Sequence, residues 1–343
     1  MPHPYRIREI AEQSGLSLAT VDRVLHGRPG VRASTVAEVH RAIADLDRQS
    51  TQVRLAGRTF LVDLVMHAPE RFSGAVRTAL EAELPDLRPA AVRTRFHLRE
   101  AARPDDLAAT LDRIGSRGSH GVLLKAPDHP AVADAVGRLA DRGVPVVTLV
   151  TDLPTSRRLA SVGIDDRAAG ATAAYLLTQW GGDGSVLVTL SSSAFRGEGE
   201  REAGFRAALD EMAPGRPVRA VTETDGLDAT MLREVARALD DDPRIDAVYS
   251  IGGGNVATLR AFADAGRTCR AFVAHDLDAD NTRLLRERRV SAVLHHDLRR
   301  DVRRACRMVM QAHGALPGVP SSVPSAVQVV TPFNEPPAVF ASR

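Results

Sequence analysis

Residues 5–28 (YRIREIAEQSGLSLATVDRVLHGR) contain the feature that most constrains the fold, because they read as two short helices joined by a tight turn. Gly15 tolerates the positive φ with which a first helix would end, and Ser17 is a favourable N-cap for a second helix. The spacing predicts a helix-turn-helix, whose second helix would enter a DNA major groove. A helical hairpin with only a packing role is the alternative. Apolar residues recur at helical spacing in both segments: Ile7, Ile10 and Ala11 in the first, Val21, Val24 and Leu25 in the second.

A third helix is indicated from Ala33 to Leu46, where Val36, Val39 and Ile43 fall on one apolar face and could close a three-helix core. Residues 1–48 are therefore expected to form a DNA-binding domain. Residues 1–58 hold nine Arg against six Asp plus Glu, about +3, whereas the whole chain carries +2. This basic excess supports DNA binding, although a solvated helix face could also produce it.

Three ordered motifs make this segment resemble the LacI family of bacterial transcription regulators. They are I-x-x-I-A-x-x-S-G-L-S-x-x-T-V at Ile7–Val21, R-V-L-x-G at Arg23–Gly27 and V-x-x-x-T at Val31–Thr35. The resemblance extends over most of the chain. It implies a homodimer that binds double-stranded operator DNA and a small-molecule effector, with no enzymatic activity.

The resemblance assigns the base-reading positions to Leu18, Ala19 and Arg23. Arg23 could reach guanine, whereas Leu18 could only pack on an apolar base edge and Ala19 offers no side-chain hydrogen bond. Asp22 departs from the family pattern, in which this position is usually Ser. A carboxylate here would either repel a phosphate or accept a hydrogen bond from a cytosine amine. Four further side chains suit phosphate oxygens, which fix register without reading sequence: Ser17, Thr20, His26 and Arg28.

Residues 49–58 are expected to form a hinge that becomes helical on DNA. The match to the family's hinge is VRLAGR at Val53–Arg58, which makes Leu55 the candidate to insert into the minor groove. The family's usual Asn-Pro before the hinge is missing, and Gln49, Ser50 and Thr51 stand in its place. A plain polar linker is the alternative for this segment.

From Thr59 onward, short apolar runs alternate with amphipathic stretches in a regular βα rhythm, which predicts parallel sheets. There are too many such units for one compact sheet, so two doubly wound lobes are expected. Helices are expected at 104–116, 130–142, 167–180, 198–212, 227–240 and 296–313. Strands are expected at 60–66, 92–98, 121–125, 145–150, 185–190, 217–222, 246–251, 270–274 and 290–294.

This layout is similar to the periplasmic-binding-protein-like effector domain of the family, in which a ligand lies between two lobes. Specific matches are VGIDDRAAG at Val162–Gly170 and REAGF at Arg201–Phe205. The resemblance implies crossings between lobes near 162–164, 291–295 and 323–326. The expected effector-binding domain is therefore residues 59–338, with an N-terminal lobe of about 59–163 and 293–324 and a C-terminal lobe of about 164–292 and 325–338.

Candidate ligand residues follow from strand ends and family positions together. The matching family arginine binds substrate hydroxyls, which makes Arg201 the first candidate, since a guanidinium offers bidentate donors. Asn255 and Asp276 stand at strand ends and could complete a hydroxyl-binding ring, and Phe72 could stack on an apolar sugar face. Lys125 is the only lysine of the chain. A carboxylate or phosphate on the ligand would explain a lysine at this strand end, and chance is the alternative. Further candidates, for which a surface or capping role is the alternative, are His67, Asp152 and His296.

Enzymatic sites are not favoured by the motifs. The glycine-rich stretches at 251–255 and 181–184 lack the spacing of nucleotide-binding loops. His295, His296 and Asp297 are adjacent and therefore point apart, so neither a metal nor a cofactor is expected. Ser191–Ser193 lack a nucleophile-elbow pattern.

The chain is therefore expected to be a cytoplasmic, dimeric, ligand-responsive regulator, and a repressor controlled by a sugar, polyol or related polar metabolite. No run spans a bilayer, the N-terminus has no signal-peptide pattern, and the terminal PPAVFASR has no heptad repeat for a tetramerisation helix. Cys269 and Cys306 are expected to be free thiols. The alternatives are a sugar- or nucleotide-processing enzyme fused to a helix-turn-helix, and a DNA-binding protein without an effector.

Overall fold

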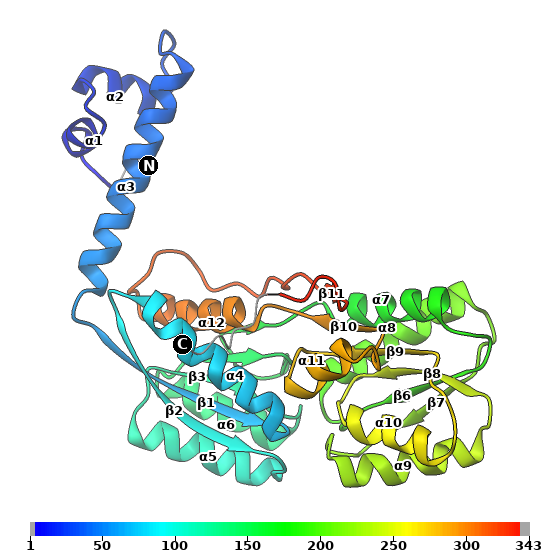
Figure 1. Ribbon diagram of the computed structural model, residues 1–343. Coiled ribbons are helices and arrows are strands. Elements are labelled where there is room, and N and C mark those ends of the chain that lie inside the picture. Colours follow the sequence, from blue (N-terminus) through cyan, green and yellow to red (C-terminus); the bar gives the residue numbers. More distant parts are fainter. Residues whose placement is uncertain (1–3, 337–343) are drawn as a thin grey trace.

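The computed structural model describes residues 4–336, so the predicted domain end at 337–338 and most of PPAVFASR lie outside the described residues. Three helices form the N-terminal domain, and the third continues into the body of the protein (Figure 1). They are α1 (Ile7–Ser14), α2 (Leu18–Leu25) and α3 (Ala33–Leu55).

The N-terminal domain is a helix-turn-helix, as the spacing predicted. Gly15 ends α1 at φ 70°, and the Ser17 side chain accepts a hydrogen bond from the Thr20 amide at 3.2 Å as the N-cap of α2. Burial of one apolar face from each helix holds the three together. The buried residues of this core are Ile10, Ala11, Val21, Val39 and Ala42.

The third helix extends further than the sequence indicated. Residues 49–55 continue α3, and only the turn from Ala56 to Arg58 separates the helix from the first strand, with Gly57 at φ 74°. Leu55 is 4% exposed and packs in the core of the first lobe, so it is not free to enter a minor groove in this arrangement. Two features favour a continuous helix here. Residues 49–55 contain no Gly or Pro that would end it, and burial of Leu55 stabilises its last turn.

The first lobe is a five-stranded sheet in the order β2-β1-β3-β4-β5, and every pairing in it is parallel. Helices α4 (Glu70–Glu83) and α12 (Leu298–Ala312) share one apolar core, and α5 (Pro104–Arg117) and α6 (Pro130–Asp141) share another on the opposite face. A short 3-10 helix, η1 (Leu84–Leu87), follows α4. The strands are β1 (Thr59–His67), β2 (Ala91–Arg99), β3 (Gly121–Lys125), β4 (Val146–Leu149) and β5 (Ala160–Val162).

The second lobe is a six-stranded sheet in the order β11-β10-β9-β8-β6-β7, parallel except for β11. Helices α7 (Asp166–Trp180) and α8 (Arg196–Met212) cover one face. Helices α9 (Asp228–Asp241), α10 (Asn255–Asp264) and α11 (Ala279–Arg286) contribute to the other core. The strands are β6 (Ser185–Thr189), β7 (Val218–Val221), β8 (Ile245–Ser250), β9 (Ala271–His275), β10 (Ala292–His295) and β11 (Gln328–Val330).

The chain crosses between the lobes three times, and the second crossing lies later than the sequence indicated. Strand β10 runs through His295 and pairs with β9 and β11, so residues 293–295 belong to the second lobe rather than the first. The crossing occupies 296–297, before α12 returns to the first lobe. The first and third crossings lie side by side, because the Ser325 amide donates to the Gly163 carbonyl at 2.8 Å.

The predicted strands all form, and the two that were not predicted, β5 and β11, have three residues each. A three-residue strand is too short to show an alternating pattern. No helix within residues 4–336 is long and apolar enough to cross a membrane.

Truncating Leu55 should destabilise the first lobe, because the side chain is buried in its core. We expect Leu55→Ala to lower the free energy of unfolding by about 2–4 kcal/mol, measured by urea denaturation of the full chain. Val53→Ala is the matched control, since Val53 lies on the same helix and is 76% exposed. Equal, small effects of the two substitutions would contradict the docking of α3.

Candidate functional site

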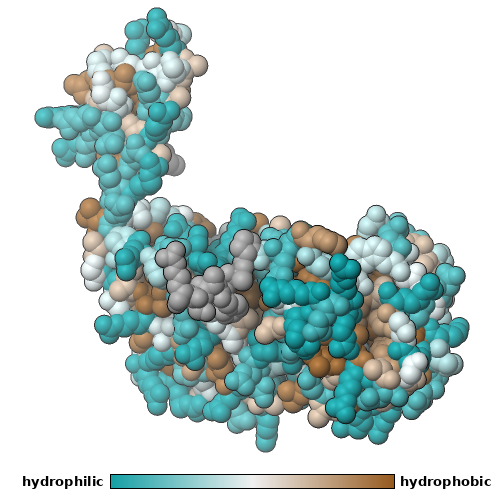
Figure 2. Space-filling model, in the orientation of Figure 1, coloured by the Kyte–Doolittle hydropathy of each residue, from teal (hydrophilic) through white to brown (hydrophobic). Residues whose placement is uncertain are grey.

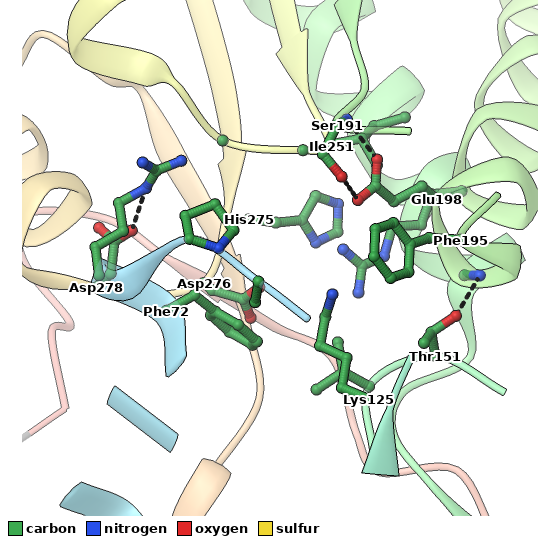
Figure 3. Close-up of a pocket in the computed structure, with 18 of the residues that line it drawn as sticks. Phe72, Lys125, Thr151, Ser191, Phe195, Glu198, Ile251, His275, Asp276 and Asp278 are labelled. Atoms are coloured by element: carbon green, nitrogen blue, oxygen red, sulfur yellow. Dashed lines mark hydrogen bonds and ion pairs between the residues drawn. The ribbon is translucent and has the colours of Figure 1, made fainter. Parts of the chain in front are cut away.

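A pocket lies between the two lobes, at the carboxyl ends of their parallel strands (Figure 3). This is the position at which open α/β sheets bind ligands, because the loops that follow neighbouring strands converge there. The first lobe contributes Ala68, Pro69, Arg71, Phe72, Lys125, Val150 and Thr151. The second lobe contributes Ser191, Phe195, Gly197, Glu198, Arg201, Ile251, Gly252, Gly253, His275, Asp276, Asp278 and Asn281.

Arg201 lies in the wall of the pocket and is 4% exposed. Its Nε donates to an Asp166 carboxylate oxygen at 2.7 Å, which leaves the rest of the guanidinium fork for a ligand. Burial lowers the pKa of Arg201, but the carboxylates of Asp166 and Asp276 outweigh it and raise that pKa above its usual value. The arginine is therefore a fixed cation in the wall.

Two glycines set the position of Arg201. A Cβ at Gly170 of α7 would lie 1.9 Å from the Arg201 carbonyl oxygen of α8, and a Cβ at Gly204 would lie 2.2 Å from the Arg167 carbonyl oxygen. Real Cβ atoms cannot approach other atoms so closely. The backbones of α7 and α8 can therefore touch only because both residues are glycine. This contact brings Asp166 beside Arg201.

Lys125 ends β3 and is 8% exposed. Its Nζ donates to the His67 carbonyl at 3.1 Å and lies 3.9 Å from the centroid of the Phe195 ring. Burial lowers the pKa of the Lys125 ammonium to about 8. A cation held by one carbonyl and one ring face has hydrogen-bonding capacity left for a ligand.

Asp276 follows β9 in a left-handed conformation, with φ 62°. His296 Nε2 lies 3.4 Å from an Asp276 carboxylate oxygen, and His296 Nδ1 is hydrogen-bonded to Asp301. Burial lowers the pKa of His296, but its contacts with Asp276 and Asp301 raise that pKa to about 9. In the same way, burial raises the pKa of Asp276, but His296 and Arg201 lower it below its usual value. Asp276 is thus an ionised acceptor at the pocket, oriented by His296.

Another part of the wall comes from the loop that follows β6 and from the first turn of α8. Glu198 accepts hydrogen bonds from the amide of Ser191, at 2.7 Å, and from its hydroxyl. The Gly197 amide donates to Thr151 Oγ1 at 3.1 Å, which joins the start of α8 to the first lobe. Phe72 and Phe195 supply aromatic surface from the first and second lobe (Figure 3).

Of the eight residues predicted to bind a ligand, four line the pocket and four do not. Phe72, Lys125, Arg201 and Asp276 line it. The other four do not line it, and each makes a contact elsewhere in the protein. The His67 ring packs on Phe195, Asp152 is hydrogen-bonded to Thr148 and Arg158, Asn255 Nδ2 donates to Asn281 Oδ1, and His296 is bonded to Asp301.

Sequence reasoning did not find several charged lining residues, among them Arg71, Glu198 and Asp278. Glu198 lies three residues before the Arg201 motif, in the first turn of α8, and that placement was the available signal. Arg71 follows the first strand beside Phe72, but only the contact between lobes brings it to the pocket.

The charges that line the pocket are balanced, with Arg71, Lys125 and Arg201 against Glu198, Asp276 and Asp278. A wall that mixes buried donors and acceptors suits a neutral ligand whose hydroxyl groups both donate and accept.

A second candidate site is the outer face of α2. Leu18 is 54% exposed, and Ala19 and Arg23 are also exposed, whereas Val21 faces the core. The hydroxyls of Ser17 and Thr20 are 2.8 Å apart and hydrogen-bonded to each other. The surface of the N-terminal domain is mainly hydrophilic (Figure 2). Such a face could meet a base edge with one guanidinium and one apolar side chain.

Asp22 on α2 contacts two of the side chains that were expected to contact phosphates. Its carboxylate lies 3.1 Å from His26 Nδ1 and 3.0 Å from Arg28 Nη1. The departure from the family pattern at Asp22 therefore has a structural counterpart, since the carboxylate occupies neighbouring donors.

Known families match both parts of the chain that carry these candidate sites. Residues 6–48 match the family described as bacterial regulatory proteins, lacI family, and residues 69–315 match the periplasmic binding protein domain. The chain is 31% identical over 278 residues to the HTH-type transcriptional regulator reg1 of Streptomyces lividans, covering 78% of this chain and 71% of that protein.

Solved structures share the fold of the two-lobed part. A glucose-galactose binding protein from Geobacillus stearothermophilus, GanP, aligns with a TM-score of 0.71 and 18% identity over 81% of this chain and 99% of that one. A putative LacI transcriptional regulator from Bacteroides fragilis aligns with a TM-score of 0.69 and 14% identity over 81% of this chain and 98% of that one.

Replacing Lys125 should stabilise the protein without ligand at neutral pH. A native pKa of about 8, below the usual value, means that the buried ammonium destabilises the fold below pH 8. This penalty disappears as the pH rises from the native to the unfolded pKa. We expect Lys125→Met to raise the free energy of unfolding by about 1–3 kcal/mol at pH 7 and by much less at pH 10, measured by urea denaturation. If the free energies of unfolding of the two proteins differed by the same amount at both pH values, burial would not lower the pKa of Lys125.

Proposed function

The chain belongs to the lacI family of bacterial regulatory proteins, and from this premise we propose that it is a dimeric repressor whose effector is a sugar, polyol or related polar metabolite. The observation that carries the proposal is that one helix, α3, joins an exposed recognition helix to a two-lobed body with a pocket. A regulator of transcription acts at the chromosome, so we expect it in the cytoplasm.

In this proposal α2 reads the operator. Arg23 donates to a guanine, and Leu18 and Ala19 make apolar contacts with base edges. Ser17, Thr20, His26 and Arg28 contact phosphates. Leu55 would have to leave the core of the first lobe before it could insert into the minor groove. Two copies related by a two-fold axis would read a pseudo-palindromic operator.

The effector binds between the lobes. Hydroxyl groups of a neutral ligand match the balanced charges of the pocket, and Phe72 offers a face for an apolar sugar surface. Similarity in fold to the glucose-galactose binding protein supports this ligand class. An anionic effector, held by Lys125, is the second candidate, because Lys125 has only a carbonyl and a ring as partners.

Effector binding would favour closed lobes and so change operator affinity, since a ligand shifts an equilibrium by its differential affinity for the two states. We expect the effector to relieve repression. The named relative is a transcriptional regulator, which supports a protein that binds its ligand without converting it.

Substitutions at the two sites should separate the two activities. Arg23→Ala should weaken binding to a duplex selected by the wild-type protein by about 1–3 kcal/mol and leave effector binding intact. Arg201→Ala should abolish effector binding and leave DNA affinity intact.

Effectors are identified first by a thermal-shift screen of sugars, polyols, sugar acids and sugar phosphates. A ligand at a hundred times its Kd stabilises the native protein by about 2.7 kcal/mol, which such a screen detects.

Phe72→Ala is a second pocket variant, which should weaken effector binding without breaking an ion pair. It tests the pocket even if Arg201→Ala fails to fold. Loss of both activities in a folded variant of either site would contradict the division of function. Turnover of a panel compound would favour an enzyme instead.

Releasing His26 and Arg28 from Asp22 should strengthen non-specific DNA binding. In Asp22→Ser the Arg28 guanidinium becomes available to a phosphate and the His26 ring can donate a hydrogen bond to another, so the slope of log K against log salt should steepen by about 1 per DNA-binding domain. The measurement is a salt titration with a random-sequence duplex. Glu38→Gln, on α3, removes the same charge from the domain without releasing this pair. An identical change in both variants would mean that net charge alone is responsible.

A further inference from the structure

Arg71 reaches from the first lobe into the second. It lies in the first turn of α4, and its Nη2 donates to the Gly226 carbonyl at 2.7 Å. Its Nε lies 3.4 Å from an Asp278 carboxylate oxygen. Both acceptors belong to loops of the second lobe, so this one side chain makes a neutral and a charged contact across the pocket.

The loops that receive Arg71 carry no side chain where it passes. A Cβ at Gly253, which has φ 87°, would lie 2.4 Å from Arg71 Nη2. A Cβ at Gly226, which has φ 66°, would lie 2.6 Å from the Gly252 carbonyl oxygen and 3.4 Å from Arg71 Nη2. The glycine-rich stretch after β8, which fits no nucleotide-binding motif, therefore leaves room for a guanidinium from the opposite lobe.

Asp278 gives the contact its charge. It is the N-cap of α11, where it accepts from the Asn281 amide at 2.7 Å, and it is 7% exposed. Burial raises the pKa of Asp278 to about 6, and the charge of Arg71 opposes this rise. A buried carboxylate is costly without a cation, so the closed arrangement is favoured by the presence of Arg71.

We propose that Arg71 and the slot formed by Gly226, Gly253 and Asp278 are an interlobe latch that holds the pocket closed. Arg71 is then a positioning residue, because it sets how long the closed state persists. The latch rests on the proposed closure of the lobes but not on the identity of the effector or operator.

A disulfide trap across the pocket tests the latch without effector or DNA. The Asp128 amide of the first lobe donates to the Ala194 carbonyl of the second at 2.8 Å. Asp128→Cys with Ala194→Cys therefore puts one thiol on each side of a direct contact between the lobes, where a disulfide should form when the lobes are closed. Native thiols should react slowly, because burial raises the pKa of Cys269 and of Cys306 to about 12.

The rate of cross-linking of the full chain under a glutathione redox buffer reports the closed population. Arg71→Ala in the double-cysteine background should slow it by about fivefold or more, the usual lower range of such couplings. Arg77→Ala should leave the rate unchanged, since Arg77 lies on the same helix and pairs with Glu81 within the first lobe. An unchanged rate in Arg71→Ala, or no cross-link in any background, would overturn the latch.

The glycine slot is tested by combining substitutions. Gly253→Ala should slow cross-linking when Arg71 is present and should add little in Arg71→Ala, because the block acts on that side chain. Backbone strain at positive φ would instead act equally in both backgrounds, and that outcome would overturn the role of the slot. If the effector panel fails while the trap behaves as expected, the latch stands and the proposed ligand class does not.

Discussion

A buried run of ion pairs and hydrogen bonds joins the pocket to the segments that connect the lobes. It passes from Asp276 at the pocket to His296 in the second crossing, then to Asp301 in α12 and to the Ser325 hydroxyl in the third crossing, 2.5 Å from Asp301 Oδ1. Charges this deeply buried are tolerated only when paired, so the crossings and the wall of the pocket must keep their relative positions. A ligand that bonds to Asp276 therefore contacts a group whose partners lie in the segments that connect the lobes.

The glycine contact between α7 and α8 supports the other side of the pocket. Gly170 and Gly204 allow the two backbones to touch, and this places the start of α8 so that Arg201 faces the pocket and Asp166 can pair with it. The stretches VGIDDRAAG and REAGF thus contain both the packing residues and the charged pair. Ligand recognition and helix packing are specified together there, because a larger residue at either glycine would displace the guanidinium.

Local patterns predicted the longer strands and the helix-turn-helix, because strand and helical spacing are local properties. Strand ends together with the family resemblance predicted four of the pocket residues. They did not predict Arg71 or Asp278 at the pocket, since that position depends on contact between lobes far apart in sequence. The burial of Leu55 in this arrangement was not predicted for a similar reason. A leucine near the end of a helix looks the same whether it faces solvent or a core supplied by later strands. The pairing of Asp22 with His26 and Arg28 needed side-chain geometry that spacing alone does not give.

The continuity of α3 determines how movement in the body reaches DNA. The helix has 23 residues, and at 1.5 Å per residue it is about 35 Å long. Since Leu55 fixes one end in the first lobe, a rotation of that lobe by about 5° would move the far end by about 3 Å. In a two-fold dimer the two recognition helices would move in opposite senses, and successive major grooves offer only about 34 Å of spacing to match. In the proposed dimer a rotation of this size would therefore be sufficient to misalign the two DNA-binding domains, without any need for α3 to unfold.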